Sequence, residues 1–147
     1  VHLIKIMDNL TQKQRRYCMS KIRSKDTKPE KAVRTILDKL NIRYNIHAKT
    51  LPGTPDIVIP EIKKIIFVNG CFWHQHKNCK RANIPKTNKE YWIKKLSRNI
   101  KKQNIDIKNL RKVGWSISVI WECQTKDETA LIKKIKRICK NDKKHCF

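Results

Sequence analysis

Two short β-branched runs constrain the fold of this chain more than any other feature. Residues 56–59 read Asp-Ile-Val-Ile and residues 65–68 read Ile-Ile-Phe-Val, and the turn Leu51-Pro52-Gly53-Thr54-Pro55 precedes the first run. Continuous apolar runs of this length are typical of central strands that are buried on both faces. Such strands need cover on each side, so the two runs predict a sheet with helices packed against it.

The remaining periodicity supplies the other elements. A polar, basic segment from Thr11 to about Ser24 is typical of a surface helix or an ordered arm. Helical spacing predicts a helix from Pro29 through Val33, Ile36, Leu37 and Leu40, a long one from Thr87 or Asn88 to about Val113, and a last one from Asp127 to Cys139. Residues 42–48 and 115–121 predict further strands. The fold class is therefore α/β, a mixed sheet flanked by helices, in a single domain over 1–147 with a flexible extension at 1–10, an arm at 11–25 and a frayed tail at 140–147.

The charge of the chain points to a polyanionic partner. There are 36 Lys and Arg against 12 Asp and Glu, a formal charge of +24, yet 39% of residues are hydrophobic, as in a folded domain. DNA or RNA is the first candidate for the partner, although an A·T-biased genome also enriches lysine. The sequence has no motif of the RNP or KH type, which makes RNA the lesser option.

The sequence predicts neither a membrane span nor a secretory signal. It has no run of 18 apolar residues, and the segment before Leu10 lacks a basic n-region and a cleavage site, with Met7 a plausible start. We therefore expect a cytoplasmic protein without membrane partners. In a reducing compartment, six cysteines serve as metal ligands or buried thiols rather than disulfides.

A cluster of soft ligands follows the second apolar run. Cys71, His76 and Cys79 lie within nine residues, and Cys123 directly follows a predicted strand that could return beside them. Thiolates and an imidazole that close a tetrahedron are what a structural Zn²⁺ requires. The alternative is that these cysteines are simply buried, as we expect for Cys18, Cys139 and Cys146.

Asp56 is a candidate ligand for a hard cation. Pro55-Asp56 ends a turn and opens a buried strand, which places the carboxylate at a sheet edge, although Asp after Pro in a turn is often only local backbone chemistry. Nucleases with this pattern carry an acid and a lysine on the following strand. Here Ile65 to Gly70 offers neither, and His74 follows four residues later.

Three aromatic residues surround the cysteine cluster. Phe72 and Trp73 lie in the polar loop, and Trp92 lies near the start of the long helix. One interpretation is that they pack over a zinc site. The other is that they wedge between base pairs, which costs a few kcal/mol of unstacking and opens a DNA site.

Five sequence blocks together form a recognisable pattern. They are Met19 to Glu30, Leu51 to Asp56, Gly70 to His74, Tyr91-Trp92 with Lys95 and Asn99, and Trp121-Glu122-Cys123. In this order they resemble the very short patch repair (Vsr) endonucleases. The resemblance covers roughly residues 11–139, and its most specific parts are the Cys-Phe-Trp-His block and the Pro-Gly-x-Pro-Asp turn.

The resemblance implies a restriction-endonuclease-like fold, a variant of the PD-(D/E)xK type, with a structural zinc. The implied activity is nicking of one strand on the 5′ side of the T in a T·G mismatch left by deamination of 5-methylcytosine. Asp56 would hold Mg²⁺ with the backbone carbonyl of Val68, His74 would be the base, and Glu30 would order water around the metal. The implied zinc ligands are Cys71, His76, Cys79 and Cys123.

The resemblance also implies how DNA is bound. Phe72, Trp73 and Trp92 would intercalate from the major groove, with Met19 and Ile22 acting from the arm. Lys95 and Asn99, one turn apart, would reach base edges or phosphates. The implied enzyme is a monomer that acts on double-stranded chromosomal DNA in a bacterial cytoplasm, with mismatch-repair proteins as further partners.

The chain departs from the family at the support of the base. Lys102-Gln103 stands where the family has Arg-Asp, and the missing acid is the one thought to support His74, so Asp106 is a candidate substitute. Asn69 replaces a His found in some members.

Two other functions compete with mismatch nicking. The first is a restriction-type endonuclease of the same fold that cuts both strands of an undamaged site, which would not need three wedging aromatics. The second is a zinc-stabilised DNA-binding module without catalysis.

Overall fold

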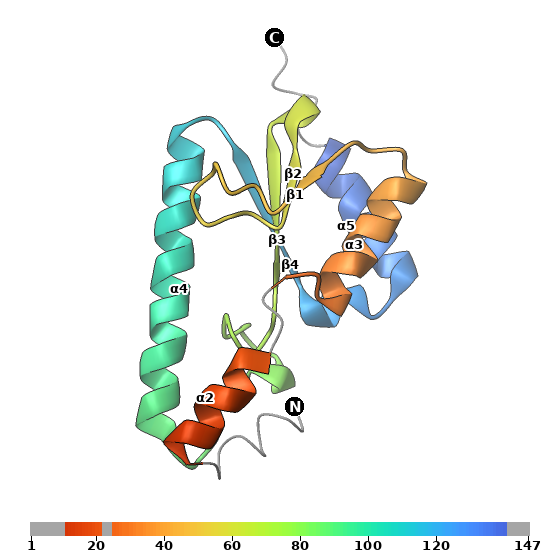
Figure 1. Ribbon diagram of the computed structural model, residues 1–147. Helices are drawn as coiled ribbons and strands as arrows, with labels where there is room; N and C mark the ends of the chain where they lie inside the picture. Colours follow the sequence, from red (N-terminus) through yellow and green to blue (C-terminus); the bar gives the residue numbers. More distant parts are fainter. Residues whose placement is uncertain (1–10, 22–24, 141–147) are drawn as a thin grey trace.

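The computed structural model describes residues 11–21 and 25–140 (Figure 1). The predictions made for the extension at 1–10, for Ile22 and for the tail beyond Lys140 lie outside the described residues. Four strands form one mixed sheet in the order β1-β2-β3-β4. They are β1 (Asn45–Ile46), β2 (Ile57–Ile59), β3 (Lys64–Asn69) and β4 (Ser116–Trp121). The helices are α2 (Gln12–Lys21), α3 (Lys28–Lys39), α4 (Lys89–Lys112) and α5 (Glu128–Lys140), with short 3-10 turns at Pro60–Ile62, Lys80–Ala82 and Glu122–Thr125.

The sheet has a parallel half and an antiparallel half. β1 pairs with β2 and β2 with β3 in antiparallel fashion, whereas β3 and β4 run parallel with Asn69 opposite Trp121. A parallel neighbour requires a crossover, which α4 provides. The predicted mixed sheet flanked by helices is therefore confirmed.

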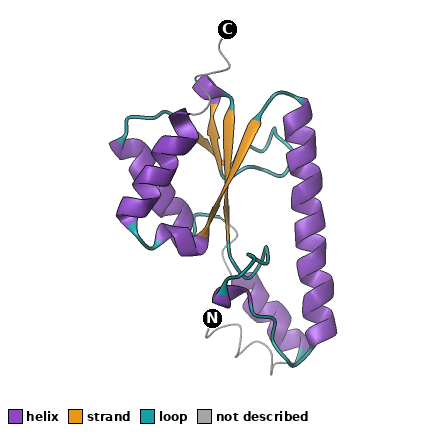
Figure 2. Cartoon of the chain, turned by 180° about the vertical axis from the view of Figure 1, so that it is seen from behind, coloured by secondary structure: helices purple, strands orange, loops and turns teal. Residues whose placement is uncertain are grey.

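Helices cover both faces of the sheet, as the apolar runs predicted. α3 and α5 pack on one face and α4 lies along the other (Figures 1 and 2). Alternate residues divide between the two cores: Ile57 and Ile66 face α3 and α5, while Val58 and Ile65 belong to the cluster with Leu110 of α4. Because successive side chains of β2 and β3 point to opposite faces of the sheet, each strand contributes to the hydrophobic core on both faces.

The helix ends follow local signals. Thr27 accepts a hydrogen bond from the Glu30 backbone and caps α3, with Pro29 in the first turn. α4 ends at Lys112, and Gly114 follows at φ +94°, where a side chain would be strained. A local glycine signal thus marks the end of the longest helix.

The first predicted strand is much shorter than expected. Of residues 42–48, only Asn45–Ile46 form β1. Ile42 still bonds back to Leu37 at the end of α3, and His47 adopts a left-handed backbone at φ +48° that interrupts the extended chain. No helix among residues 11–21 and 25–140 is long and apolar enough to cross a bilayer.

Candidate active site and metal cluster

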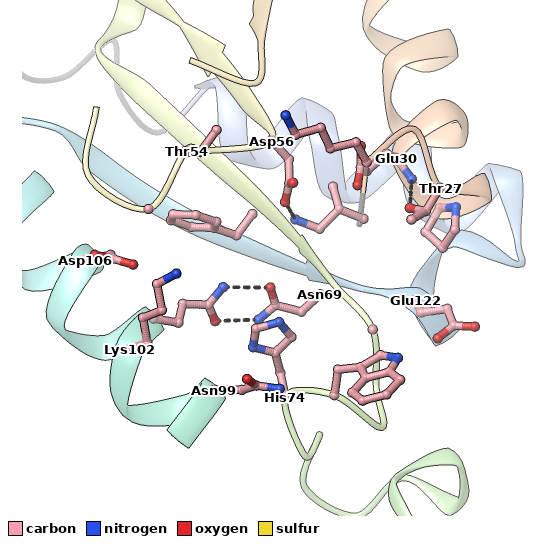
Figure 3. A pocket seen from close by; sticks show the side chains of 18 of the residues that line it. Thr27, Glu30, Thr54, Asp56, Asn69, His74, Asn99, Lys102, Asp106 and Glu122 are labelled. Carbon is pink, nitrogen blue, oxygen red and sulfur yellow. Dashed lines mark hydrogen bonds between the residues drawn. The ribbon is translucent and has the colours of Figure 1, made fainter. Parts of the chain in front are cut away.

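A cleft of about 840 Å³ opens where the N-terminus of α3, the end of β3 and the middle of α4 meet (Figure 3). Its lining includes all four residues to which the sequence assigned the chemistry: Glu30, Asp56, Val68 and His74. They come from three separate segments, and only the tertiary structure brings them to one cavity. Asp56 and Glu30 lie together on one side in Figure 3, and α4 presents polar side chains, among them Asn99, Lys102 and Asp106, from the other.

Asp56 is held at the start of β2 by the neighbouring strand. Its Oδ2 accepts a hydrogen bond from the Val68 backbone N–H at 2.8 Å. The pKa of Asp56 is raised to about 6, chiefly by burial and also by the negative charge of Glu30, against the lowering effect of the Val68 hydrogen bond. A buried carboxylate beside a second acid is stabilised in its charged form by a cation. These oxygen donors fit a hard divalent ion such as Mg²⁺.

We expect the substitution Asp56→Asn to stabilise the protein at pH 8 when no Mg²⁺ is added. Because the folded protein binds the Asp56 proton more tightly than the unfolded chain, wild-type stability falls as pH rises from the ordinary value of 3.8 through about 6. The gain from Asn should approach about 3 kcal/mol at pH 8 and fall to about 0.5 kcal/mol at pH 4, close to the ordinary pKa of the carboxyl. Urea unfolding at both pH values measures it, with the exposed Asp38→Asn as control; equal gains at both pH values would contradict it.

His74 is half-buried in the cleft wall, and no acid among the described residues is hydrogen-bonded to it. Burial lowers its pKa, which keeps the imidazole neutral and able to accept a proton. Its buried Nδ1 has no hydrogen-bond partner among the described residues. Asp106 does not replace the family acid, because it packs against Gly53 instead: a Cβ built on Gly53 would lie 2.8 Å from Asp106 Cβ. Gly53 has φ +76°, so both space and backbone require glycine there.

Gln103 pairs with Asn69 rather than with His74. Asn69 Nδ2 donates to Gln103 Oε1 at 2.7 Å, and Gln103 Nε2 donates to Asn69 Oδ1 at 2.9 Å. The pair joins the end of β3 to α4 and lines the same cleft as His74 (Figure 3). The two departures that the sequence displayed separately, Asn69 and Gln103, are therefore one reciprocal contact of neutral amides.

One row of α4 faces the cleft. Its members recur at helical spacing and all line the cavity: Lys95, Asn99, Lys102, Gln103 and Asp106. The sequence had singled out Lys95 and Asn99 for DNA contact, and the structure places both on this row. Lys102 was noted only as a departure from the family pattern. Helical periodicity counted from Lys95 would have added it.

His47 lines the same cleft and was missed by the sequence analysis. Its Nε2 lies 3.4 Å from Asp26 Oδ1 and 3.7 Å from Glu30 Oε2. Arg34 also bonds Asp26 Oδ1, at 2.9 Å, and the hydrogen bonds of Arg34 and then His47 lower the pKa of Asp26. No local pattern marks His47, because its contacts come from segments 17 to 21 residues away.

The three predicted wedge residues form a small core. Phe72 and Trp92 are 4% and 0% exposed, with ring centroids 5.5 Å apart, and Trp73 is half-buried 5.1 Å from Phe72. Met19 and Cys18 of α2 pack against them. The exposure expected of wedges is therefore not found for Phe72 and Trp92. Intercalation stays a prediction, and it requires α2 to move aside.

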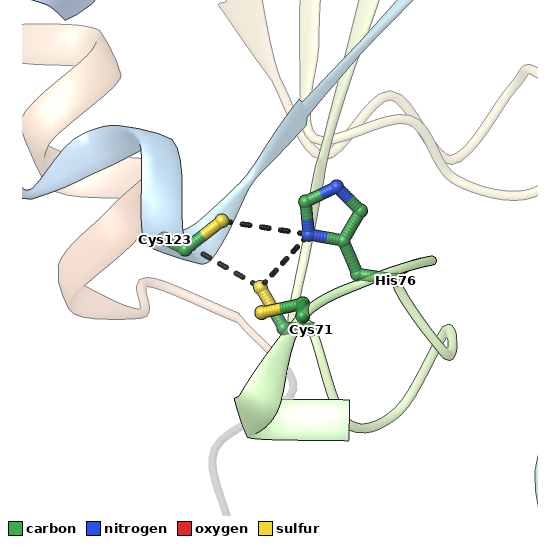
Figure 4. Close-up of side chains that lie close together, drawn as sticks. Cys71, His76 and Cys123 are labelled. Carbon is green, nitrogen blue, oxygen red and sulfur yellow. Dashed lines mark hydrogen bonds between the residues drawn. The ribbon is translucent and has the colours of Figure 1, made fainter. Parts of the chain in front are cut away.

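The soft ligands gather as predicted (Figure 4). His76 Nδ1 lies 3.6 Å from Cys71 Sγ and 3.4 Å from Cys123 Sγ, and the ligand atoms of these three and Cys79 lie within 4.8 Å of one another. A tetrahedral Zn²⁺ separates its sulfur and nitrogen ligands by about 3.5 Å. The donor set and spacing therefore fit zinc.

Strand register explains how Cys123 reaches the cluster. Asn69 and Trp121 are paired at the ends of parallel β3 and β4, so Cys71 and Cys123 each follow their strand by two residues. The Cys123 N–H donates to Cys71 Sγ at 3.4 Å, and the His76 ring stacks on Trp121 at 4.2 Å. The segments that follow β3 and β4 are thus in contact with each other at the end of the sheet.

Comparison with known proteins adds independent information. The sequence profile of the family described as DNA mismatch endonuclease Vsr matches residues 7–81. A type II nicking enzyme of Xanthomonas oryzae pv. oryzae is 41% identical over 131 residues, 89% of this chain and 96% of that protein. A type II nicking enzyme of Neisseria meningitidis serogroup A is 37% identical over 92% of this chain and 96% of its own. The DNA mismatch endonuclease Vsr of Escherichia coli is 35% identical over 71% of this chain and 67% of its own.

Proposed function

The chain belongs to the Vsr family of DNA mismatch endonucleases, and from this premise we propose that it nicks one strand of duplex DNA 5′ of the thymine in a T·G mismatch. Membership makes it a DNA endonuclease. The mismatch, the strand choice and an origin in deaminated 5-methylcytosine belong to the proposal. The observation that carries the proposal is that Asp56, Glu30 and His74 line the same cleft.

Asp56 and the Val68 carbonyl would hold Mg²⁺, with Glu30 ordering the surrounding water. The fit rests on the donor set: two carboxylates, one of them with its pKa raised to about 6 by burial, at one end of the cleft. Mg²⁺ bound there would neutralise charge that develops on the scissile phosphate. Glu30 is 3% exposed, which suits an oriented carboxylate better than a freely solvated one.

His74 would accept the proton of the attacking water. Burial keeps its imidazole neutral, the form that a general base needs. Because no acid among the described residues bonds Nδ1, packing must orient the ring, and the Asn69–Gln103 amide pair lines the same cleft. The base would therefore be positioned by neutral groups rather than by a carboxylate.

DNA would lie across the cleft and along α4. The charge of +24 supplies non-specific attraction to phosphates, and Lys95 and Asn99 project from α4 into the cleft. Phe72, Trp73 and Trp92 would wedge beside the mismatch once Met19 and the rest of α2 move aside. A T·G wobble is easier to unstack than a matched pair, so wedging would add selectivity.

The remaining assignments follow from the same family. We propose a restriction-endonuclease-like fold, consistent with the mixed sheet, and a structural Zn²⁺ bound by Cys71, His76, Cys79 and Cys123. We also propose a single-domain monomer that acts on chromosomal DNA in the cytoplasm, with mismatch-repair proteins as partners. A restriction-type enzyme remains the alternative that the substrate experiment must separate.

A panel of duplexes tests the proposal. With Mg²⁺ present, a T·G duplex is expected to be nicked on the T strand only, 5′ of the T, while the matched T·A and C·G duplexes of the same sequence stay intact. Labelling each strand separately and mapping the product end gives both strand and position. Cleavage of both strands of the matched duplex would instead identify a restriction-type endonuclease.

A further inference from the structure

Glu30 is a buried acid whose surroundings are unusually specific. Its side chain is 4% exposed in the first turn of α3. Glu30 Oε2 accepts the Asp26 backbone N–H at 3.0 Å and lies 3.7 Å from His47 Nε2. A carboxylate this deeply buried is costly unless donors or a positive charge face it. His47 is the basic side chain found within 4 Å of Glu30 among the described residues.

His47 also contacts the segment that carries Asp56. Its backbone N–H donates to the Asp56 carbonyl at 3.3 Å, next to the strand pairing of Ile46 with Ile57. One residue therefore touches both of the acids proposed for the metal centre, Glu30 through its ring and Asp56 through its backbone. This bridge joins the two carboxylate-bearing segments.

The backbone at His47 is held in an uncommon conformation. Its φ is +48°, in the left-handed region that few non-glycine residues adopt, and Asp26 across the contact has φ +54°. Conformations of this kind cost of order 1 kcal/mol or more and persist where surrounding contacts over-determine them, as at active sites. The strained backbone at His47 is thus consistent with a residue whose position is fixed by the contacts of the site.

Arg34 binds Asp26, the other acidic side chain close to His47. It bonds Asp26 Oδ1 at 2.9 Å, the same oxygen that lies 3.4 Å from His47 Nε2. Asp26, Glu30 and His47 could by distance alone hold a metal ion. Because Arg34 already neutralises Asp26, the arrangement favours a chain of side chains that orients His47.

We propose that His47 is a positioning residue for the nuclease centre, which fixes Glu30 relative to Asp56 and so sets the affinity of the centre for its divalent ion. The inference rests on the proposed function of these two acids. His47 touches neither DNA nor the reacting atoms in this role. It acts through the two carboxylate-bearing segments.

Two amide variants separate this role from a purely structural one. Asparagine tolerates a left-handed backbone, but His47→Asn shortens the side chain so that its amide cannot reach Glu30. His47→Gln places an Nε2 donor near the position of the imidazole Nε2, in a backbone that suits glutamine less well. Backbone strain therefore favours Asn, whereas reach to Glu30 favours Gln. Asn45→Ala, an exposed change two residues away, is the matched control.

The experiment measures single-turnover nicking of a T·G duplex across a Mg²⁺ titration, and Mn²⁺ affinity of the protein–DNA complex by electron paramagnetic resonance. His47→Asn is expected to nick about 10- to 100-fold more slowly and to need more Mg²⁺, because groups that orient metal ligands have effects of this size. His47→Gln should recover most of the rate and affinity. Asn45→Ala should match wild type, and DNA affinity without Mg²⁺ should be unchanged in all three.

Equal rates and metal midpoints for His47→Asn and wild type would overturn the inference, as would His47→Gln proving the worse of the two. The failure of the proposed function looks different. If wild type binds Mn²⁺ but nicks no duplex, mismatch nicking is wrong, and the Mn²⁺ affinities of the two variants still decide the role of His47.

Discussion

Asp56→Asn is expected to lower the nicking rate on a T·G duplex by about three orders of magnitude, equivalent to about 4 kcal/mol of transition-state stabilisation. The asparagine oxygen can still accept the Val68 N–H that Asp56 Oδ2 accepts at 2.8 Å, so the local fold survives. What is lost is the negative charge that would hold Mg²⁺. Single-turnover rates at saturating enzyme measure the loss.

Two controls make this result interpretable. Asp38→Asn removes an exposed carboxylate from α3, away from the cleft, and should nick like wild type. DNA affinity of Asp56→Asn measured without Mg²⁺ should not fall. Nicking at the wild-type rate by Asp56→Asn would remove the metal assignment. If both Asp56→Asn and His74→Ala left every measurable activity untouched, a non-catalytic DNA-binding module would be the better description.

Loss of one zinc ligand is expected to have the largest effect on stability. Binding of Zn²⁺ to a four-ligand structural site contributes of order 10 kcal/mol, comparable to the entire net stability of a small domain. Cys123→Ser should therefore yield protein without zinc that is unfolded or insoluble. Cys71, with 0% exposure, should be as sensitive.

Zinc content and tryptophan emission together measure this effect. The His76 ring stacks on Trp121, with ring centroids 4.2 Å apart and an interplanar angle of 8°. Opening of the cysteine and histidine cluster should therefore change tryptophan fluorescence. Cys139→Ala, which changes a cysteine outside the cluster, should keep one zinc per chain. A freshly purified wild-type protein that is folded and contains no zinc would contradict the assignment of all four ligands.

Local sequence patterns predicted the main elements and the cysteine ligands, but they did not decide whether each aromatic residue is buried. The strands at 57–59 and 64–69 and the helix at 89–112 lie where local periodicity placed them. The cysteine spacing identified three ligands of the cluster, and the position of Cys123 after a strand suggested the fourth. The sequence left open whether Trp92 packs inside the protein or faces DNA, because an aromatic residue at a helix start has the same local pattern in both cases, and the structure buries it at 0% exposure.

The surroundings of Glu30 and His74 could be learned only from the folded chain. His47 meets Glu30 from 17 residues away and Asn69 meets Gln103 from 34 residues away. Neither contact has a local signature, since each partner alone is an ordinary polar residue. The sequence had left open what supports His74, and within residues 11–21 and 25–140 no acid is bonded to its Nδ1.

The sequence by itself determined the α/β class, the positions of the longer strands and helices, the family and the residues that carry its motifs. These depend on hydrophobic period, caps and ligand spacing, which act over a few residues. Tertiary structure alone decided that α2 covers the aromatic residues, that Gln103 bonds Asn69, and that His47 joins Glu30 to Asp56. Such contacts depend on the register of β3 against β4 and on how α3 and α4 pack against the sheet, and long-range packing of this kind leaves no periodic trace along the chain.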